Sequence, residues 1–234
     1  MMRIVTNRRI PVWIKVAYSL FVAVLVPLYW ITYSPWNFLY FCDIALLVTG
    51  VAISVESPLL ISMQAVAITA PQILWVIDFL SRLIAGVNIT GVTSYMFDSG
   101  IPLFLRALSL FHGWLPFLLL WLLWRLGYDR RALGIQSVIA IVVLAISYFF
   151  APAPPPSASH PNWAVNINYV YGLDDKHPQT FMAPWLWLLV MMATHLIAVY
   201  LPTHLVLRHI FDAPSLKSRH SGERSRVRKR WDAR

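Results

Sequence analysis

Residues 58–83, PLLISMQAVAITAPQILWVIDFLSRL, form an apolar run in which the first charged residue is Asp78. A helix needs about 20 residues to cross a hydrocarbon core roughly 30 Å thick, so this run is long enough to span a membrane at a tilt. Pro71 removes one helical hydrogen bond, which predicts a kink near the middle of the run. Gln64, Pro71 and Asp78 recur every seven residues and are therefore predicted to share one inward-facing stripe.

Five further apolar runs lie on either side of this one in the sequence. Hydrophobic residues make up 59% of the chain and charged residues only 12%, which is the composition of a membrane protein. Because a helix satisfies its own backbone hydrogen bonds in lipid, each run is predicted to be a helix. The predicted fold class is therefore all-α, a polytopic membrane protein with a bundle of six transmembrane helices. The six predicted spans are residues 12–32, 37–55, 58–83, 101–126, 135–150 and 183–207.

Lys and Arg are distributed unevenly around these spans. With a cytoplasmic N-terminus, 16 of the 19 fall on the cytoplasmic side, and the exceptions are Arg82, Arg106 and Lys176. This bias predicts a multi-pass protein of the cell (inner) membrane with both termini in the cytoplasm. The predicted domains are a six-helix transmembrane domain, residues 1–211, and a basic, disordered cytoplasmic tail, residues 212–234.

The tail indicates which partners to expect. It carries eight Lys or Arg against three acidic residues, and each basic residue near an anionic leaflet adds about 1 kcal/mol of attraction. The predicted partners are therefore membrane lipids, with anionic headgroups at the tail. No nucleic-acid partner is expected, because no nucleic-acid-binding motif accompanies the charge.

Motifs for metals and cofactors are not found in the sequence. Cys42 is the single cysteine, which excludes an internal disulfide and a multi-cysteine metal site. His195 and His204 are nine residues apart, about 180° around a helix, so they cannot bind one metal as a pair. The chain contains no Walker loop, nucleophile elbow or HExxH sequence. We therefore predict neither a cofactor nor a metal site.

Five ionisable residues inside the predicted spans lie at one depth, near the outer leaflet: Asp43, Asp78, Arg82, Arg106 and His112. A charge at the centre of a bilayer costs about 2.5–3.5 kcal/mol, so such residues usually face the bundle interior and pair. Their spacing allows Asp78 to pair with Arg82 on one helix, and the matching depth predicts that Asp43 or Asp78 pairs with Arg106. The alternative is a purely structural network that locks the helices together.

Cys42 and His112 are the candidates for catalysis. A free cysteine is commonly a small buried apolar residue, which is the alternative to a nucleophilic Cys42. The imidazole of His112 could be a general base, a donor to a lipid headgroup or a polar contact between helices.

The two outer loops contain polar and turn-forming residues. Ser99 is predicted to cap the fourth span, with Pro102 in its first turn. In the second loop, residues 162–172, NWAVNINYVYG, alternate apolar and polar residues, which predicts either a short strand or a segment that lies against the bundle. Asn168 lies within this segment.

The sequences WNFLYFCDIALL, SYMFDSGIPLFLRALSLFHGWLPFLLLWLLWRLGYDRRAL and NINYVYG resemble an uncharacterised bacterial family of six-span membrane-associated proteins. This resemblance covers nearly the whole chain and implies no activity. A more distant likeness is to the androgen-induced transmembrane hydrolases, which cleave fatty acid esters of hydroxy fatty acids with a Thr and a His. His112 matches the His of that family, whereas Tyr40 stands at the Thr position, two residues before Cys42.

Three hypotheses of function follow. The first is an intramembrane enzyme, a lipid ester hydrolase or acyltransferase, that acts from the outer leaflet. The second is a small-solute or lipid transporter or carrier, which is less favoured because the sequence shows no inverted repeat. The third is a non-catalytic membrane scaffold.

The first hypothesis assigns roles to particular residues. His112 is the predicted base, Cys42 or a water molecule is the nucleophile, and Asp43 positions the site. The predicted substrate-binding residues are Arg106, Asp78, Arg82 and Asn168.

Overall fold

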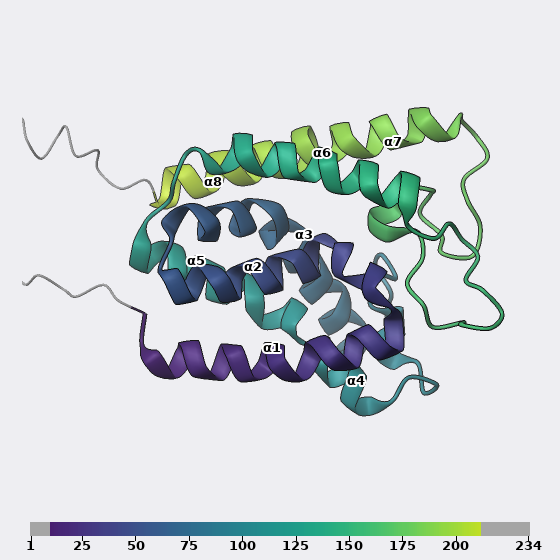
Figure 1. Cartoon of the computed structure of the whole chain (residues 1–234), viewed down its shortest axis with the longest axis horizontal. Coiled ribbons are helices and arrows are strands. Elements are labelled where there is room, and N and C mark those ends of the chain that lie inside the picture. Colours follow the sequence, from purple (N-terminus) through teal and green to yellow (C-terminus); the bar gives the residue numbers. More distant parts are fainter. Residues whose placement is uncertain (1–9, 212–234) are drawn as a thin grey trace, which may run out of the picture.

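The computed structural model describes residues 10–211, and this part of the chain is helical without any strand. The predicted all-α fold class is confirmed (Figure 1). The α-helices are α1 (Val12–Tyr33), α2 (Phe41–Val55), α3 (Pro58–Ala85), α4 (Leu103–Leu108), α5 (Phe111–Leu126), α6 (Ala132–Phe150), α7 (Pro184–Ala193) and α8 (Leu201–Phe211). Short helical segments are η1 (Pro35–Leu39), η2 (Ser94–Phe97), η3 (Ile167–Tyr169) and the π-helix η4 (Thr194–Tyr200).

Five of the six predicted spans are long and apolar enough to cross a membrane. The exception is α2, which has only 15 residues because the first part of its predicted span forms η1 instead. The fourth span is interrupted between α4 and α5, and the sixth is the continuous series α7, η4 and α8. The fifth begins at Ala132, three residues earlier than predicted, and therefore reaches 19 residues.

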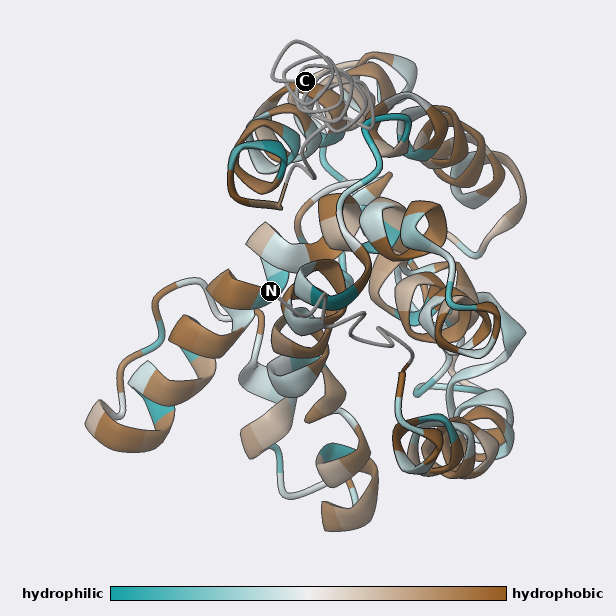
Figure 2. Cartoon of the chain, turned by 90° about the vertical axis from the view of Figure 1, so that its left-hand side faces the viewer, coloured by the Kyte–Doolittle hydropathy of each residue, from teal (hydrophilic) through white to brown (hydrophobic). Residues whose placement is uncertain are grey.

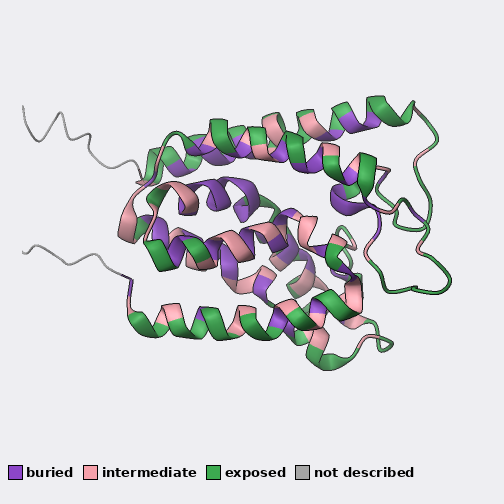
Figure 3. Ribbon diagram, viewed as in Figure 1, coloured by how far each residue is buried: buried purple, intermediate pink, exposed green. Residues whose placement is uncertain are grey.

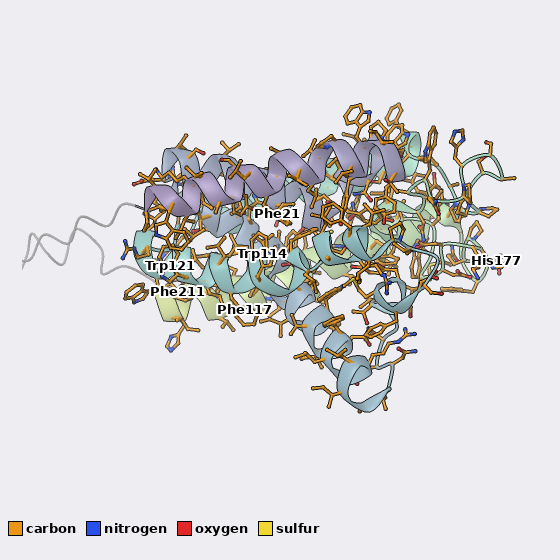
Figure 4. The ribbon with its side chains drawn as sticks, turned by 90° about the horizontal axis from the view of Figure 1, so that it is seen from below. Phe21, Trp114, Phe117, Trp121, His177 and Phe211 are labelled. Carbon is orange, nitrogen blue, oxygen red and sulfur yellow. The ribbon has the colours of Figure 1, made fainter. Side chains whose placement is uncertain are left out.

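Both ends of the described chain lie at the same end of the bundle, which we call the terminal end (Figure 1). The connections 86–102 and 151–183 lie at the opposite end, which we call the loop end. His177 and Phe211 mark these two ends in Figure 4. An even number of crossings explains this arrangement. The predicted basic tail, residues 212–234, lies outside the described residues.

Helix α3 is the central element of the bundle. It packs against α2, α5, α6, η4 and α8, and every residue from Ile61 to Thr69 is buried (Figure 3). A helix that is apolar and buried on all sides occupies the middle of a bundle. α1 packs at the side of this bundle, where Phe21 meets Trp114 of α5 with ring centroids 5.2 Å apart (Figure 4).

The second half of α3 leaves the bundle. Ala70 and Pro71 are exposed, whereas Trp75 and Asp78 are buried again by the loop-end segments. In Figure 4 this half is the pale blue helix that projects downward. The predicted inward stripe of Gln64, Pro71 and Asp78 is therefore wrong at Pro71, because the buried face of α3 at that level carries Gln72 and Trp75 instead.

Hydrophobic residues predominate along the helices (Figure 2), and many of the large ones are exposed. Trp13, Ile31, Ile84, Leu103 and Phe149 are all largely exposed. Contiguous apolar surface of this kind is stable in lipid and not in water. The length, composition and outer surface of the helices together indicate a multi-pass membrane protein.

The loop-end segments differ in two details from the sequence-based expectations. The residue that caps α4 is Pro102 and not Ser99, because residues 98–101 form a turn in which Asp98 accepts the Gly100 N–H at 2.8 Å. Residues 162–172 contain no strand and lie against the bundle, with Ile167 and Val170 fully buried. The second of the two predicted alternatives for this segment is therefore the observed one.

Candidate functional site

The N-terminus of α2 is fastened by the second loop-end connection. The Asn168 Oδ1 accepts the Phe41 N–H at 3.0 Å, and its Nδ2 donates to the Leu39 carbonyl at 2.8 Å. The Tyr40 hydroxyl donates to the Val165 carbonyl at 3.0 Å. Asn168 adopts a left-handed conformation, with φ 56°, which asparagine tolerates better than most residues. Its amide thus binds the backbone at the start of α2.

Asp43 is the third residue of α2 and is only 3% exposed. Its Oδ2 accepts from Asn37 Nδ2 at 3.2 Å and from Cys42 Sγ at 3.7 Å. Its Oδ1 has no hydrogen-bond partner in the described part of the chain. The predicted ion pair with Arg106 is not formed, since Arg106 Nη1 instead donates to the Met96 carbonyl at 3.0 Å.

Asp78 has a different environment, although it is equally buried. Its Oδ1 accepts the N–H groups of three successive loop residues, at 2.9, 2.7 and 3.2 Å for Ile89, Thr90 and Gly91. Its Oδ2 accepts both the N–H and the hydroxyl of Thr93, at 3.1 and 2.6 Å. The predicted pairing of Asp78 with an arginine is therefore wrong. The chain reverses after α3 and offers backbone donors that already satisfy the carboxylate.

His112 is the second residue of α5 and is held in one orientation. Its Nδ1 lies 2.8 Å from the Ser109 carbonyl oxygen. Because a carbonyl oxygen only accepts, this contact assigns the proton of the neutral imidazole to Nδ1 and leaves a lone pair on Nε2. Nε2 has no hydrogen-bond partner among residues 10–211. The ring also stacks on Trp75, with centroids 5.3 Å apart and an interplanar angle of 21°.

Hydroxyl groups lie beside two residues that His112 contacts, Ser109 and Trp75. The Ser109 Oγ and the Tyr29 hydroxyl are 2.7 Å apart, and Trp75 Nε1 donates to the Tyr95 hydroxyl at 3.3 Å. Burial raises the pKa of Tyr95, the hydrogen bond from Trp75 opposes that rise, and the nearby Cys42 and Asp43 add to it. Tyr95 is thus close to the residues at the start of α2 as well as to Trp75. We call this group the loop-end polar cluster: Tyr29, Cys42, Asp43, Trp75, Tyr95, Ser109 and His112.

Four members of the loop-end polar cluster were not predicted as site residues: Tyr29, Trp75, Tyr95 and Ser109. Aromatic residues near the ends of spans are expected in any membrane protein, so their presence in the sequence does not indicate a site. The spacing of Ser109 and His112, one helical turn apart, is the signal that could have indicated the contact between them. Nothing in the local sequence places η2, and hence Tyr95, beside α2.

Arg82 and Arg106 both lie beside η2. They contact two consecutive residues of it, Phe97 and Met96. The Arg82 guanidinium carbon is 4.6 Å from the centroid of the Phe97 ring. Arg106 binds the carbonyl of Met96, as described above. Neither arginine forms an ion pair within residues 10–211.

The two histidines of the predicted sixth span, His195 and His204, contact different groups. His195 Nδ1 lies 2.8 Å from the Met191 carbonyl, and His204 Nδ1 lies 2.6 Å from the Tyr128 hydroxyl. Across residues 10–211, no group of three His, Cys, Asp or Glu side chains is arranged to hold a metal ion. The structure therefore adds no metal site to those considered from the sequence.

A scan against protein-family models found no match, and searches of the curated proteins and of the solved structures found none either. The resemblances drawn from the sequence stay predictions. The conclusion that the chain supports at this point is a multi-pass, all-helical membrane protein with a convergent polar cluster at the loop end.

Proposed function

We propose that this protein is an intramembrane hydrolase that cleaves lipid esters at the loop-end polar cluster, from the outer leaflet. The observation that carries the proposal is the state of His112. Its Nδ1 is fixed by the Ser109 carbonyl, and its Nε2 keeps a lone pair without a protein partner in the described chain. An oriented imidazole with one free nitrogen is what a general base requires.

The proposed reaction uses water as the nucleophile. His112 Nε2 takes a proton from the water as its oxygen forms a bond to the ester carbonyl carbon. The tetrahedral intermediate then collapses, and the bond to the alcohol oxygen breaks. Asp43, in its neutral form, gives a proton to the leaving alcohol and recovers one from the imidazolium through water. One ester and one water are consumed, and one carboxylic acid and one alcohol are released.

Two further residues fit this reaction. Trp75 donates to the Tyr95 oxygen, so the Tyr95 hydroxyl proton is available to stabilise the oxyanion. Cys42 donates to Asp43, so its proton stays on the sulfur, whereas a nucleophilic cysteine needs the thiolate. We therefore assign the attack to water and assign Cys42 the role of orienting Asp43.

The orientation of the site in the membrane is part of the proposal. The basic residues on the terminal-end connections and at the chain ends support a cytoplasmic terminal end. The loop end, with the polar cluster, then faces the outer leaflet. Substrate would enter from that leaflet, and the polar product would leave toward the outside.

The test measures release of free fatty acid by mass spectrometry from protein in nanodiscs that contain a mixed lipid extract. We expect His112→Gln to lower the rate at least 100-fold, in the range typical of a lost general base, and Cys42→Ser to stay within threefold of wild type. His195→Gln is the matched control, because its Nδ1 makes the same kind of contact, with a carbonyl one turn earlier. A wild-type protein without activity, or an active His112→Gln, would exclude this function.

A carrier is the second candidate, and it rests on a separate observation. Buried polar atoms without partners lie along α3, namely both amide atoms of Gln72, Gln64 Oε1 and Thr69 Oγ1. In a membrane such atoms are costly unless internal water or a passing solute satisfies them. If the protein is a carrier, Gln72→Leu should abolish solute uptake into proteoliposomes while His112→Gln leaves it unchanged. Uptake that survives Gln72→Leu would argue against this path.

A further inference from the structure

Two guanidinium groups converge on η2 at the loop end. Arg106 Nη1 donates to the Met96 carbonyl at 3.0 Å, and the Arg82 guanidinium lies over the ring of Phe97, 4.6 Å from its centroid. Because Met96 and Phe97 are consecutive, the two positive charges come from α3 and α4 to neighbouring points of the same short helix. One anionic group of moderate size would reach both.

No carboxylate in the described part of the chain compensates these charges. Asp78, the nearest acid on α3, already accepts five hydrogen bonds from the loop at residues 89–93. Asp98 follows Phe97 directly, but it is exposed and its Oδ1 accepts the Gly100 N–H. Lys15, Arg131 and His177, elsewhere in residues 10–211, do form ion pairs with acidic side chains.

Each of the two arginines also has a nitrogen that is shielded from solvent without an acceptor. These atoms are Arg82 Nη1 and Arg106 Nε. A charged donor that is buried and unpaired is unfavourable, and a bound anion supplies the acceptor that is missing. The planar guanidinium group matches phosphate and carboxylate oxygens through paired N–H donors.

The surroundings of the two arginines are apolar. Leu83, Ile84, Leu103 and Phe104 are all exposed on the same two helices, α3 and α4. An anion held there would therefore have hydrocarbon surface on both sides, as the phosphate of a membrane lipid has. A soluble anion gains nothing from those side chains.

We propose that the substrate is a glycerophospholipid whose phosphate binds between Arg82 and Arg106 on η2; this rests on the proposed hydrolase function. η2 also carries Tyr95, a member of the loop-end polar cluster. The acyl ester bonds of a glycerophospholipid are a few covalent bonds from its phosphate. A phosphate on one side of η2 thus places an ester near the cluster, and the arginines select lipids that carry a phosphodiester.

The experiment measures binding directly, by native mass spectrometry of the detergent-solubilised full chain. The probes are phosphatidylglycerol, diacylglycerol with the same acyl chains, and inorganic phosphate as a competitor. We expect phosphatidylglycerol to bind at least tenfold more tightly than diacylglycerol. The double variant Arg82→Gln/Arg106→Gln should lose that difference, whereas Lys176→Gln, which removes the third basic residue of the loop end, should keep it.

Three outcomes would overturn the inference. These are equal binding of the two lipids, a double variant that binds phosphatidylglycerol like wild type, and displacement of the lipid by millimolar inorganic phosphate, which would identify a site for free phosphate. If the double variant does not fold, the single variant Arg82→Gln takes its place in the binding assay. Within residues 10–211 the Arg82 guanidinium makes only the ring contact with Phe97, so its loss should disturb the fold less. The single variant should then weaken phosphatidylglycerol binding severalfold, and unchanged binding would contradict the proposal.

The binding assay separates this inference from the hydrolase function. His112→Gln should bind phosphatidylglycerol like wild type, since His112 does not contact the arginines. Selective binding without any ester cleavage by wild type would reject the hydrolase and retain the phosphate site. Cleavage of phosphatidylglycerol at the same rate by wild type and by the arginine double variant would reject the phosphate site and retain the hydrolase.

Discussion

Two aspartates in this chain, Asp43 and Asp78, show how differently a bundle treats buried carboxyl groups. Both are almost inaccessible and both lie toward the loop end of apolar helices. Asp78 accepts five hydrogen bonds, four of them from backbone N–H groups, whereas Asp43 accepts two and keeps one oxygen without a partner in the described chain. A satisfied carboxylate holds structure, and an incompletely satisfied one is available for chemistry.

Asp78→Asn should destabilise the protein. The amide offers one acceptor oxygen where the carboxylate offers two. Its NH₂ group would face loop N–H groups, which are also donors. With a charge-assisted hydrogen bond contributing about 1.5–3 kcal/mol, we expect a loss of about 2–4 kcal/mol in the free energy of unfolding. Equilibrium unfolding in detergent measures this loss in the free energy of unfolding. Asp98→Asn is the control, because that exposed residue accepts only the Gly100 N–H, and an equal loss in both variants would contradict the prediction.

Asp129, in the turn between α5 and α6, should make the stability of the protein depend on pH. The hydrogen bond from Arg131 holds the pKa of Asp129 below its ordinary value, so the folded state binds this proton less readily than the unfolded state. The contribution to stability is therefore complete above about pH 5 and is lost as the pH falls through the lowered pKa. The pair is largely exposed, with side-chain exposures of 72% for Arg131 and 21% for Asp129, which limits the contribution to about 0.5 kcal/mol.

The measurement compares the melting temperatures of wild type and Asp129→Asn at two pH values. At pH 7 the variant should melt about 1–2 °C lower, and at pH 3 the two proteins should melt together. A difference that persists unchanged at pH 3 would show that Asp129 acts through something other than its charge.

At the scale of the elements, the start of α2 depends on a segment more than 120 residues away. η1 precedes this helix, its N-cap Tyr40 provides no capping side chain, and the missing acceptor for the Phe41 N–H comes from Asn168 in η3. The segment that provides it is itself unusual, since Asn166, Asn168 and Tyr169 all have positive φ. Such conformations persist only where the surroundings determine them. The loop at residues 151–183 therefore acts as part of the site and not merely as a connection.

Asn168→Ala should loosen the start of α2. The change leaves the Phe41 N–H and the Leu39 carbonyl unpaired, at a cost of about 1–3 kcal/mol. Cys42 is the only thiol of the chain and reports this directly, because it lies in the first turn of α2. Its reaction with a maleimide in the folded protein should become severalfold faster than in wild type. Asn162→Ala, an exposed change in the same loop, should leave the rate unaltered, and an unaltered rate in Asn168→Ala would contradict the role given to Asn168.

For the whole molecule, the placement of both described ends at one end of the bundle constrains the topology. Five helical stretches long enough to span a membrane, together with the shorter α2, give six crossings. The short α2 is accommodated because it lies between α1 and α3 and does not need to match the bilayer alone. Within residues 10–211, Lys15, Arg125, Arg130, Arg131 and Arg208 lie toward the terminal end, and the proposal of a cytoplasmic terminal end rests on such basic residues.

Cysteine labelling tests this topology in intact cells. In a Cys42→Ala background, Ser157→Cys lies in the exposed loop-end connection, and Ser221→Cys lies beyond the described residues. A membrane-impermeant maleimide should label Ser157→Cys from outside and reach Ser221→Cys only after the cells are opened. Labelling of both from one side would reject the single crossing between them and, with it, the six-span topology.

The helices of this protein could be predicted from the sequence because their causes are local. Apolar runs such as residues 58–83 have the length and hydropathy of spans, and their backbones need no partner outside the helix. Pro71 did predict a kink in α3, whereas the interruption at residues 109–110 and the π-helical segment were not foreseen. Those features depend on which neighbours each helix meets.

The site could be predicted only in part, and for a related reason. The sequence predicted that Asp43, Asp78, Arg106 and His112 lie toward the same end of the spans, since this follows from position along each span, and all four lie toward the loop end. It assigned their partners wrongly, because charge and spacing alone favour ion pairs, whereas folding brought backbone N–H groups to Asp78 and a carbonyl to Arg106. Hydropathy is a property of each segment, but a hydrogen-bond partner is decided by which loop the tertiary structure places beside it.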